Sequence, residues 1–278
     1  MPELPDVEGF RRVLADHGRG RRVERVEVAD PGVLRGVTAP RLRRALTGRR
    51  LAEPERHGKW LLARTDGPSL LLHFGMTGRL LPAAPADPPH PHDRVTFTLA
   101  GERQLRYRDQ RKLQGLRLAA TDADLDEVLG GQGPDALTVD RPLLDRLLDG
   151  RRARVKAVLI DQSVLAGLGN LLGDEILWRA RVDPARPARD LDAGERGRLA
   201  DALRGVLRDA VRAGCVPARP SWLTGHREGP DPVCPRCGGP LSKDRIAGRS
   251  TTWCPHCQAG RGTSARVAGP RGRPHSGS

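Results

Sequence analysis

The sequence of 278 residues predicts an α+β fold: an N-terminal antiparallel β-sandwich with a leading helix, then a C-terminal helical domain that carries a zinc ribbon. Three observations predict it. The apolar segments before Gly130 are short and show no βαβ alternation, which favours antiparallel sheets. After Gly131 the apolar spacing becomes helical. Four of the five cysteines then form two CxxC pairs near the C-terminus.

The N-terminal elements begin with a helix. Residues 6–16 carry four apolar side chains at helical spacing, and Pro5 just before them suits a helix start. Residues 22–29 alternate between apolar and polar side chains, which predicts a strand. Two hairpins with Gly-containing turns follow. Their strands are predicted at 60–63 and 69–74, and at 95–99 and 104–108. The Pro- and Ala-rich stretch 82–91 is predicted to be a loop.

The C-terminal half is predicted to be helical. Helices are expected at 143–148, 154–161 and 171–180. Asp192 and Glu195 have the spacing of a capping box, which opens a longer helix with one apolar face. Residues 216–232 contain four prolines and are predicted to be a loop. No internal repeat is visible.

The cysteines predict one structural Zn²⁺ ion. Sixteen residues separate the pair Cys234 and Cys237 from the pair Cys254 and Cys257, which is the spacing of a four-thiolate zinc ribbon. Four thiolates leave no open coordination position, so the ion is not catalytic. The alternative is two disulfides, which an intracellular setting opposes. Cys215 is left over and is given no role.

The charge favours a polyanionic partner. Lys and Arg number 48 against 34 Asp and Glu, a formal net charge of +14. The high Arg, Gly and Pro content also fits GC-rich coding sequence, which weakens this argument. No run approaches the ~18 apolar residues of a membrane span, and the N-terminus has no signal-peptide core. A soluble, cytoplasmic protein without a membrane partner is expected.

Three motifs occur in a specific order. They are Met1-Pro-Glu-Leu-Pro-Asp-Val-Glu8, Gly167-Leu-Gly-Asn170 and the zinc ribbon. Over residues 2–258 the chain resembles the formamidopyrimidine-DNA glycosylase and endonuclease VIII family of base-excision repair enzymes. Pro-Glu-Leu-Pro is closer to the formamidopyrimidine branch. The resemblance implies a bifunctional DNA glycosylase and AP lyase, a monomer, acting on double-stranded DNA with a damaged base or abasic site.

The residue patterns and the resemblance together predict a domain organisation, in which the tail is read from composition alone. Its parts are a catalytic β-sandwich at 2–125, a helix–two-turn–helix DNA-binding domain at 126–230, the zinc ribbon at 231–260 and a disordered basic tail at 261–278. DNA is expected in the cleft between the two larger domains. In a bacterial cell the protein would associate with the nucleoid through that DNA.

The N-terminus predicts the nucleophile. Removal of Met1 would leave Pro2 as a secondary amine, and an α-amine is far more often neutral at pH 7 than a lysine. Attack on the sugar C1′ would expel the base and give an iminium, which permits strand cleavage by elimination. Glu3 is placed to move protons at the sugar. By the resemblance Lys59 acts in the elimination, Arg249 grips the phosphate at the lesion, and His92 contacts DNA phosphate.

A Gly-rich turn is expected to supply the group that enters the base stack. By the resemblance Met76 fills the space left by an everted nucleotide, Arg111 faces the orphaned base and Lys112 meets a phosphate. A core methionine and a solvated basic turn are the alternatives. Leu113 stands where the formamidopyrimidine branch carries Phe, and Asp6 stands where the family usually has Glu.

The helical domain is expected to hold phosphates. The resemblance assigns this to Lys156, Asn170 and the amides of the 167–169 turn, with Arg152 one helical turn before Lys156 on the same face. Two alternatives to the enzyme remain open. One is a non-catalytic lesion- or DNA-binding relative, and the other is a zinc-ribbon transcription or recombination factor. The sequence leaves the preferred lesion open.

Overall fold

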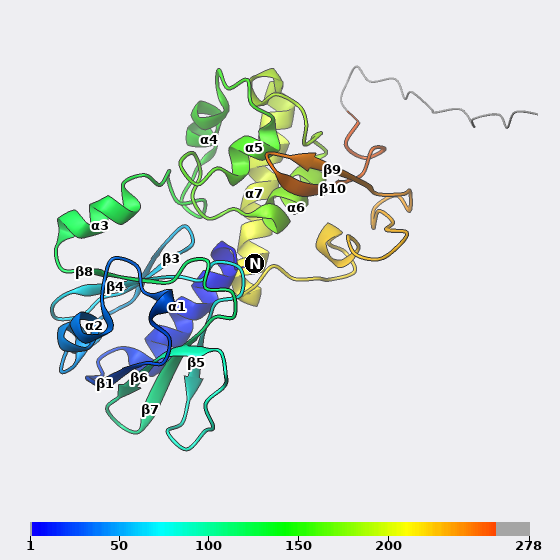
Figure 1. Cartoon of the computed structure of the whole chain (residues 1–278). Coiled ribbons are helices and arrows are strands. Elements are labelled where there is room, and N and C mark those ends of the chain that lie inside the picture. Colours follow the sequence, from blue (N-terminus) through cyan, green and yellow to red (C-terminus); the bar gives the residue numbers. More distant parts are fainter. Residues whose placement is uncertain (1, 260–278) are drawn as a thin grey trace, which may run out of the picture.

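The computed structural model describes residues 2–259, which form two lobes joined by α1 (Leu4–Gly18) and α7 (Ala193–Ala213) (Figure 1). The N-terminal lobe contains two four-stranded antiparallel sheets. The first has the order β1 (Val23–Val28), β6 (Asp93–Leu99), β7 (Arg103–Arg108) and β5 (Arg79–Ala83). The second has the order β2 (Glu55–His57), β3 (Trp60–Ala63), β4 (Ser69–His73) and β8 (Leu116–Ala119). Side chains of both sheets share one core, so the predicted sandwich is confirmed.

The second sheet is buried on both faces. Leu61 and Leu72 face the sandwich core, whereas Leu62 and Leu71 face outward and pack with Leu125 of α3 (Asp122–Leu129). This arrangement explains the unbroken apolar runs of β3 and β4, because a strand covered on both faces has no polar side to alternate with.

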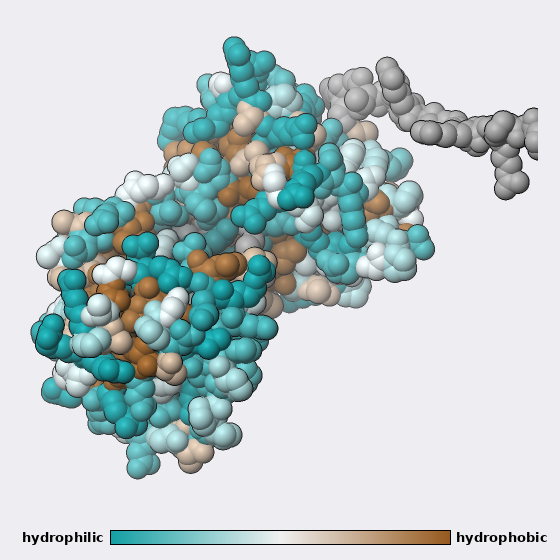
Figure 2. Space-filling view, in the orientation of Figure 1, coloured by the Kyte–Doolittle hydropathy of each residue, from teal (hydrophilic) through white to brown (hydrophobic). Residues whose placement is uncertain are grey.

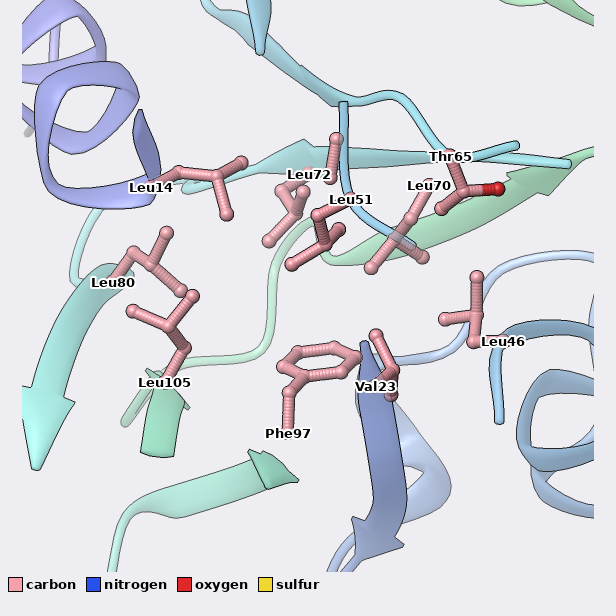
Figure 3. Close-up of a pocket in the computed structure, with 11 residues that line it drawn as sticks. Leu14, Val23, Leu46, Leu51, Thr65, Leu70, Leu72, Leu80, Phe97 and Leu105 are labelled. Carbon is pink, nitrogen blue, oxygen red and sulfur yellow. The ribbon is translucent and has the colours of Figure 1, made fainter. Parts of the chain in front are cut away.

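A small void lies inside the sandwich core (Figure 3). Its volume of about 20 Å³ would hold about one water molecule, but a buried water needs two or more polar partners. The lining is apolar except for Thr65. We conclude that the void is a packing defect rather than a ligand site.

Helix α1 contributes to the cores of both lobes. Leu4 packs in the helical lobe, whereas Val7 and Leu14 pack in the sandwich. The helix begins at Leu4, two residues earlier than predicted, so Pro5 lies inside its first turn. The side chain of Asp6 accepts a hydrogen bond from the backbone N–H of Glu3 at 2.9 Å and caps the helix.

The second lobe is helical, as predicted. It contains α4 (Arg141–Leu148), α5 (Val155–Ile160), α6 (Asn170–Ala180) and α7 around one apolar core. The predicted capping box opens α7: Glu195 N–H donates to Asp192 Oδ1 at 2.8 Å, and Asp192 N–H donates to Glu195 Oε2 at 2.9 Å. Within residues 2–259, no helix is long and apolar enough to cross a membrane.

A two-stranded antiparallel hairpin completes the fold. It is formed by β9 (Ser242–Ile246) and β10 (Arg249–Trp253), and β10 packs against α6. Three short 3₁₀ helices, η1 (Pro31–Val33), η2 (Ala188–Asp190) and η3 (Leu223–Gly225), lie in the connections. The last of these interrupts the loop predicted at 216–232.

The structure differs from the sequence prediction at several places, and the strands β2 and β8 were not predicted. It adds α2 (Ala39–Leu46) and α3, both capped by a threonine whose side chain accepts a backbone N–H. Pro82 and Ala83 end β5 instead of starting a loop, which an edge strand allows because it needs no ladder donor there. The tail predicted at 261–278 lies outside the described residues, and the division at residue 125 falls within α3.

Candidate active site between the two lobes

A cleft of about 340 Å³ lies between the lobes and is lined from both sides. The N-terminal lobe contributes Pro2, Lys59 and Met76, and the C-terminal lobe contributes Asn170 and Arg249. Figure 2 shows a hollow between two mainly hydrophilic lobes, with apolar side chains reaching the surface beside it. The structure therefore gathers residues that are up to 247 positions apart, Pro2 and Arg249, which were singled out separately in the sequence.

Glu3 is fixed at the base of this cleft by the N-terminus of α6. Its carboxylate is fully buried and accepts three backbone hydrogen bonds, from the N–H groups of Gly169 (2.8 Å), Leu171 (2.8 Å) and Leu172 (3.1 Å). These are donors that an α-helix leaves unsatisfied at its start, where the helix dipole also favours a negative charge. Two lobes thus combine to orient one carboxylate.

The turn before α6 has to approach Glu3 closely. A β-carbon on Gly169 would lie 2.4 Å from Cδ of Glu3, so only glycine fits there. Gly167 has a φ of +111°, and its N–H donates to Oε1 of Gln162. The prediction that the amides of this turn bind phosphate is therefore wrong for Gly167 and Gly169, because both amides are already used inside the protein.

Burial shifts the two charged groups of the cleft in opposite directions. Complete burial raises the pKa of the Glu3 carboxyl, against the opposing effects of Lys59 and the three backbone donors. Burial lowers the pKa of the Lys59 ammonium, and Arg249 adds to this effect, whereas Glu3 opposes it. Both shifts bring the groups nearer to the neutral range in which proton transfer is efficient.

Lys59 stands on a rigid turn. It occupies the two-residue connection between β2 and β3, where Gly58 has a φ of +55°. Asp135 holds this turn to the second lobe, since it accepts from the N–H of Gly58 at 2.6 Å and from both terminal nitrogens of Arg56. The position of Lys59 thus depends on a contact between the lobes.

Met76 and Leu113 form an exposed apolar edge of the cleft. Their exposures of 38% and 50% are unusual for large apolar side chains, which excludes the alternative of a core methionine. Arg111 lies beside them and donates to Sδ of Met76 at 3.0 Å. Lys112 points elsewhere and pairs with Asp30 at 2.8 Å, with a φ of +52°. Of the two basic neighbours predicted for Met76, Arg111 therefore lies beside it, whereas Lys112 is turned toward Asp30.

A second cavity adjoins the first at Pro2 and Met76. It is also lined by Asp6, His92 and Cys215. His92 is half-buried, and its Nδ1 lies 3.1 Å from a terminal nitrogen of Arg94. Sequence reasoning gave no role to Cys215, and only the fold brings the end of α7 to the first turn of α1.

Two predicted phosphate ligands are not placed as expected. Arg152 precedes α5, which begins at Val155, so it shares no helical face with Lys156. It is exposed, whereas Lys156 is fully buried. The fully buried ammonium group of Lys156 donates to Ser250 and Thr251 and forms an ion pair with Asp174, so it is not presented to a phosphate. Both predictions assumed a solvent-facing helix.

The four paired cysteines fit one tetrahedral zinc ion. Their sulfur atoms all lie within 4.8 Å of one another, with 3.9 Å between Cys234 and Cys257 and 3.6 Å between Cys237 and Cys254. Tetrahedral Zn–S bonds of ~2.3 Å require sulfur separations of about 3.8 Å, whereas a disulfide requires ~2.05 Å. Trp178 Nε1–H donates to Sγ of Cys234 at 3.3 Å, which is the kind of outer contact that orients a metal ligand.

Comparison with known proteins identifies the family. The N-terminal domain model of formamidopyrimidine-DNA glycosylase matches residues 1–116, and its H2TH domain model matches residues 131–219. A model for the zinc finger found in FPG and IleRS matches residues 232–260. This chain belongs to the formamidopyrimidine-DNA glycosylase family.

Individual relatives agree over nearly the whole length. Formamidopyrimidine-DNA glycosylases of Heliobacterium modesticaldum and Halorhodospira halophila are 38% and 39% identical, over 93% of this chain and 100% of each relative. Fpg of Lactococcus lactis, solved in complex with DNA that contains an abasic site, aligns with a TM-score of 0.83 at 30% identity. That alignment covers 93% of this chain and 100% of the other. A Lactococcus lactis complex with Fapy-dG-containing DNA gives 0.84.

Membership of the formamidopyrimidine-DNA glycosylase family confirms the predicted fold and the zinc finger. Sequence reasoning missed several residues that line the cleft, among them His73, Gln114 and Gln162. The Gly-rich turn at 167–169 was a signal for Gln162. The side-chain amide of Gln162, five residues before Gly167, accepts from the N–H of Gly167 and donates to the carbonyl oxygen of Leu168. For His73 and Gln114 the sequence carried no signal except that they lie close along the chain to Met76 and Leu113.

Proposed function

We infer that this protein is a base-excision repair DNA glycosylase with AP lyase activity, which removes a damaged base and then cleaves the strand. The observation that carries this inference is the convergence of Pro2, Lys59 and Arg249 on one cleft, above a buried carboxylate from Glu3. A DNA-binding protein without catalysis has no need for such an arrangement, because burying the Glu3 carboxylate and the Lys59 ammonium is costly.

We propose that Pro2 is the nucleophile once Met1 has been removed. Its secondary amine attacks C1′ of the nucleotide, the bond from C1′ to the base breaks, and the base leaves with a proton. Glu3 holds and moves protons at the sugar during this step. The resulting iminium acidifies C2′; loss of that proton expels the 3′ phosphate, and a second elimination expels the 5′ phosphate. Lys59 supplies a proton in the elimination, and Arg249 holds the phosphate at the lesion.

The exposed edge of the cleft supports a role in base eversion. We propose that Met76 fills the gap left by the everted nucleotide, with Leu113 beside it, and that Arg111 faces the orphaned base. Eversion costs a few kcal/mol, so a side chain that replaces the lost stacking lowers the barrier. The side chains of His92, Lys112, Arg152 and Asn170 would contact phosphates, and the salt dependence of binding would follow from these contacts.

The substrate class follows from the relatives. The Lactococcus lactis enzyme was solved with DNA containing abasic sites and with DNA containing Fapy-dG. We propose the same classes for this chain, with duplex DNA bound by a monomer and the zinc ion serving only to fold the hairpin. Because its substrate is chromosomal DNA and the relatives are bacterial, the protein would act in the cytoplasm at the nucleoid.

A panel of duplexes, each with one defined lesion, tests this function. The protein is incubated with duplexes that contain an oxidised purine, an oxidised pyrimidine or an abasic site, and base release and strand cleavage are scored separately. We expect strand cleavage at the abasic site, and release of oxidised purines followed by cleavage. Binding to all these duplexes without release or cleavage would contradict the proposal and favour the non-catalytic alternative.

A further inference from the structure

The helical lobe contains an ion pair that faces no solvent. Nζ of Lys156 on α5 lies 2.6 Å from Oδ1 of Asp174 on α6, and the side chains are 0% and 2% exposed. Neither residue lines the cleft. A buried ion pair of this kind is a poor source of stability, since its desolvation offsets much of its attraction and apolar residues of the same size often do as well. The presence of this buried ion pair therefore needs an explanation other than stability.

All but one of the remaining contacts of the pair go to three consecutive residues of β10. The ammonium of Lys156 donates to the carbonyl oxygen of Ser250 at 2.9 Å and to Oγ1 of Thr251 at 2.7 Å. The carboxylate of Asp174 accepts from the backbone N–H of Thr252 at 3.1 Å through Oδ2. Arg227, from the loop before the hairpin, lies 3.3 Å from the same oxygen. One pair of charges thus fixes the strand at three successive positions.

Arg249 directly precedes these residues. It is the first residue of β10 and is itself exposed in the cleft with Pro2 and Lys59. Its own pairing partner in β9 is Ile246, which is buried, whereas the partners of the next three residues, Arg245, Asp244 and Lys243, are all exposed. Arg249 is therefore held by its pairing with Ile246, while the three residues that follow it are held by the buried ion pair.

We propose that Lys156 and Asp174 are positioning residues that hold Arg249 in the cleft. This inference rests on the proposed function and deepens it. A guanidinium that has to meet one phosphate oxygen must be placed to within a fraction of an ångström, and two neighbouring helices supply that precision through fixed charges. Lys156 acts from behind the strand and does not contact DNA.

A double-mutant cycle tests the coupling. Lys156→Gln should lower strand cleavage at an abasic site about 10- to 100-fold, because a small misplacement of a catalytic group has effects of that size. Its products should shift toward single elimination, and those of Arg249→Ala should shift in the same way, because we propose that the guanidinium also assists the second elimination. In the Arg249→Ala background, Lys156→Gln should have little further effect, since residues that act as one unit are non-additive.

Glu175, which follows Asp174 on α6, provides the matched control. It is as buried as Asp174, but it pairs with Arg179 at 2.8 Å and accepts a hydrogen bond from Thr224 N–H. Glu175 therefore holds η3 and not β10. Glu175→Gln should leave the product ratio unchanged, and its effect should add to that of Arg249→Ala. If Lys156→Gln does not fold, Thr251→Val removes one contact of the ammonium and should shift the products in the same direction to a smaller extent.

Two results would overturn the inference. One is an unchanged product ratio in folded, zinc-containing Lys156→Gln, or in Thr251→Val if the former does not fold. The other is full additivity with Arg249→Ala. Amide hydrogen exchange of residues 249–252 keeps the test separate from the proposed function. If the wild type cleaves nothing, the function has failed, but unchanged exchange in the same variants would still refute the positioning, and faster exchange would support it.

Discussion

The Cα of Gly169 lies so close to the Glu3 carboxylate that a β-carbon at residue 169 would stand 2.4 Å from Cδ of Glu3. The two residues are 166 positions apart and belong to different lobes. This contact lets three amides at the start of α6 reach the carboxylate. The carboxylate that we propose to be catalytic therefore also joins the two lobes.

Gly169→Ala should displace Glu3 from this position. We expect release of an intact damaged base to fall about 100-fold, because proton transfer depends on placement at this scale, while cleavage of a preformed abasic site falls much less. Single-turnover rates on the two substrates measure the split. Gly205→Ala is the control, since nothing lies within 4 Å of its β-carbon in α7, and it should raise stability by roughly 0.5–1 kcal/mol. Equal losses on both substrates would count against the role of Glu3.

Met76→Ala should weaken excision from duplex DNA more than cleavage of a preformed abasic site. Loss of the stacking substitute raises the cost of eversion, and about 1.4 kcal/mol is enough for a tenfold loss of rate. Leu137→Ala is a matched control, because Leu137 is 40% exposed, close to the 38% of Met76, but lies outside the cleft. A variant that loses both activities to the same degree would show that Met76 supports the fold instead.

Removal of zinc should unfold the hairpin that carries Arg249. The purified protein should contain about one equivalent of zinc, as four thiolate ligands hold one ion. Cys254→Ser should lower both zinc content and DNA affinity, because a hairpin this small has little core of its own. Cys215→Ser leaves all four ligands intact and should retain the metal. Normal DNA binding after complete chelation of zinc would be inconsistent with this role.

His73 should make stability depend on pH. Burial, with a smaller effect from Lys59, lowers the pKa of the His73 imidazole to about 4, against ~6.5 in an unfolded chain. Between these values the unfolded chain binds a proton that the native protein does not. The contribution is therefore fully present above pH ~6.5 and is lost as pH falls toward about 4, by up to ~3 kcal/mol.

Urea unfolding at several pH values measures this contribution. His73→Asn keeps an acceptor for the N–H of Gly75, which donates to Nδ1 at 3.1 Å, but it cannot titrate. Below pH ~6.5 the variant should lose less stability than the wild type for each unit of pH. Identical slopes for the two proteins would mean that the pKa of His73 is not lowered in the native protein.

Local patterns were sufficient for much of the fold. The turns at Asp66-Gly67-Pro68 and Ala100-Gly101 and the capping box at Asp192 each act over a few residues, and the hairpins and α7 were predicted from them. Two helices were missed, because α2 and α3 are short and are stabilised by packing on sheets that the sequence does not place. Their threonine caps were the available signal.

The site was predictable only in part, for a related reason. The ordered motifs indicated the family, and hence Pro2, Lys59 and Arg249 as one group. The partners of Glu3 and Lys156 could not be predicted, since both depend on which chain segments meet between α5, α6 and β10. A lysine in a basic sequence suggests phosphate, and only its complete burial shows that it serves the protein instead.

The most direct test of the account is to trap the nucleophile. The protein is mixed with duplex DNA that contains an abasic site, reduced with borohydride, digested and mapped by mass spectrometry. We predict a covalent adduct on Pro2, in a mature chain that lacks Met1, because reduction converts the iminium into a stable amine. Pro2→Gly should trap far less. An active protein that retains Met1, an adduct mapped only to Lys59, or no adduct with any abasic DNA would contradict the account.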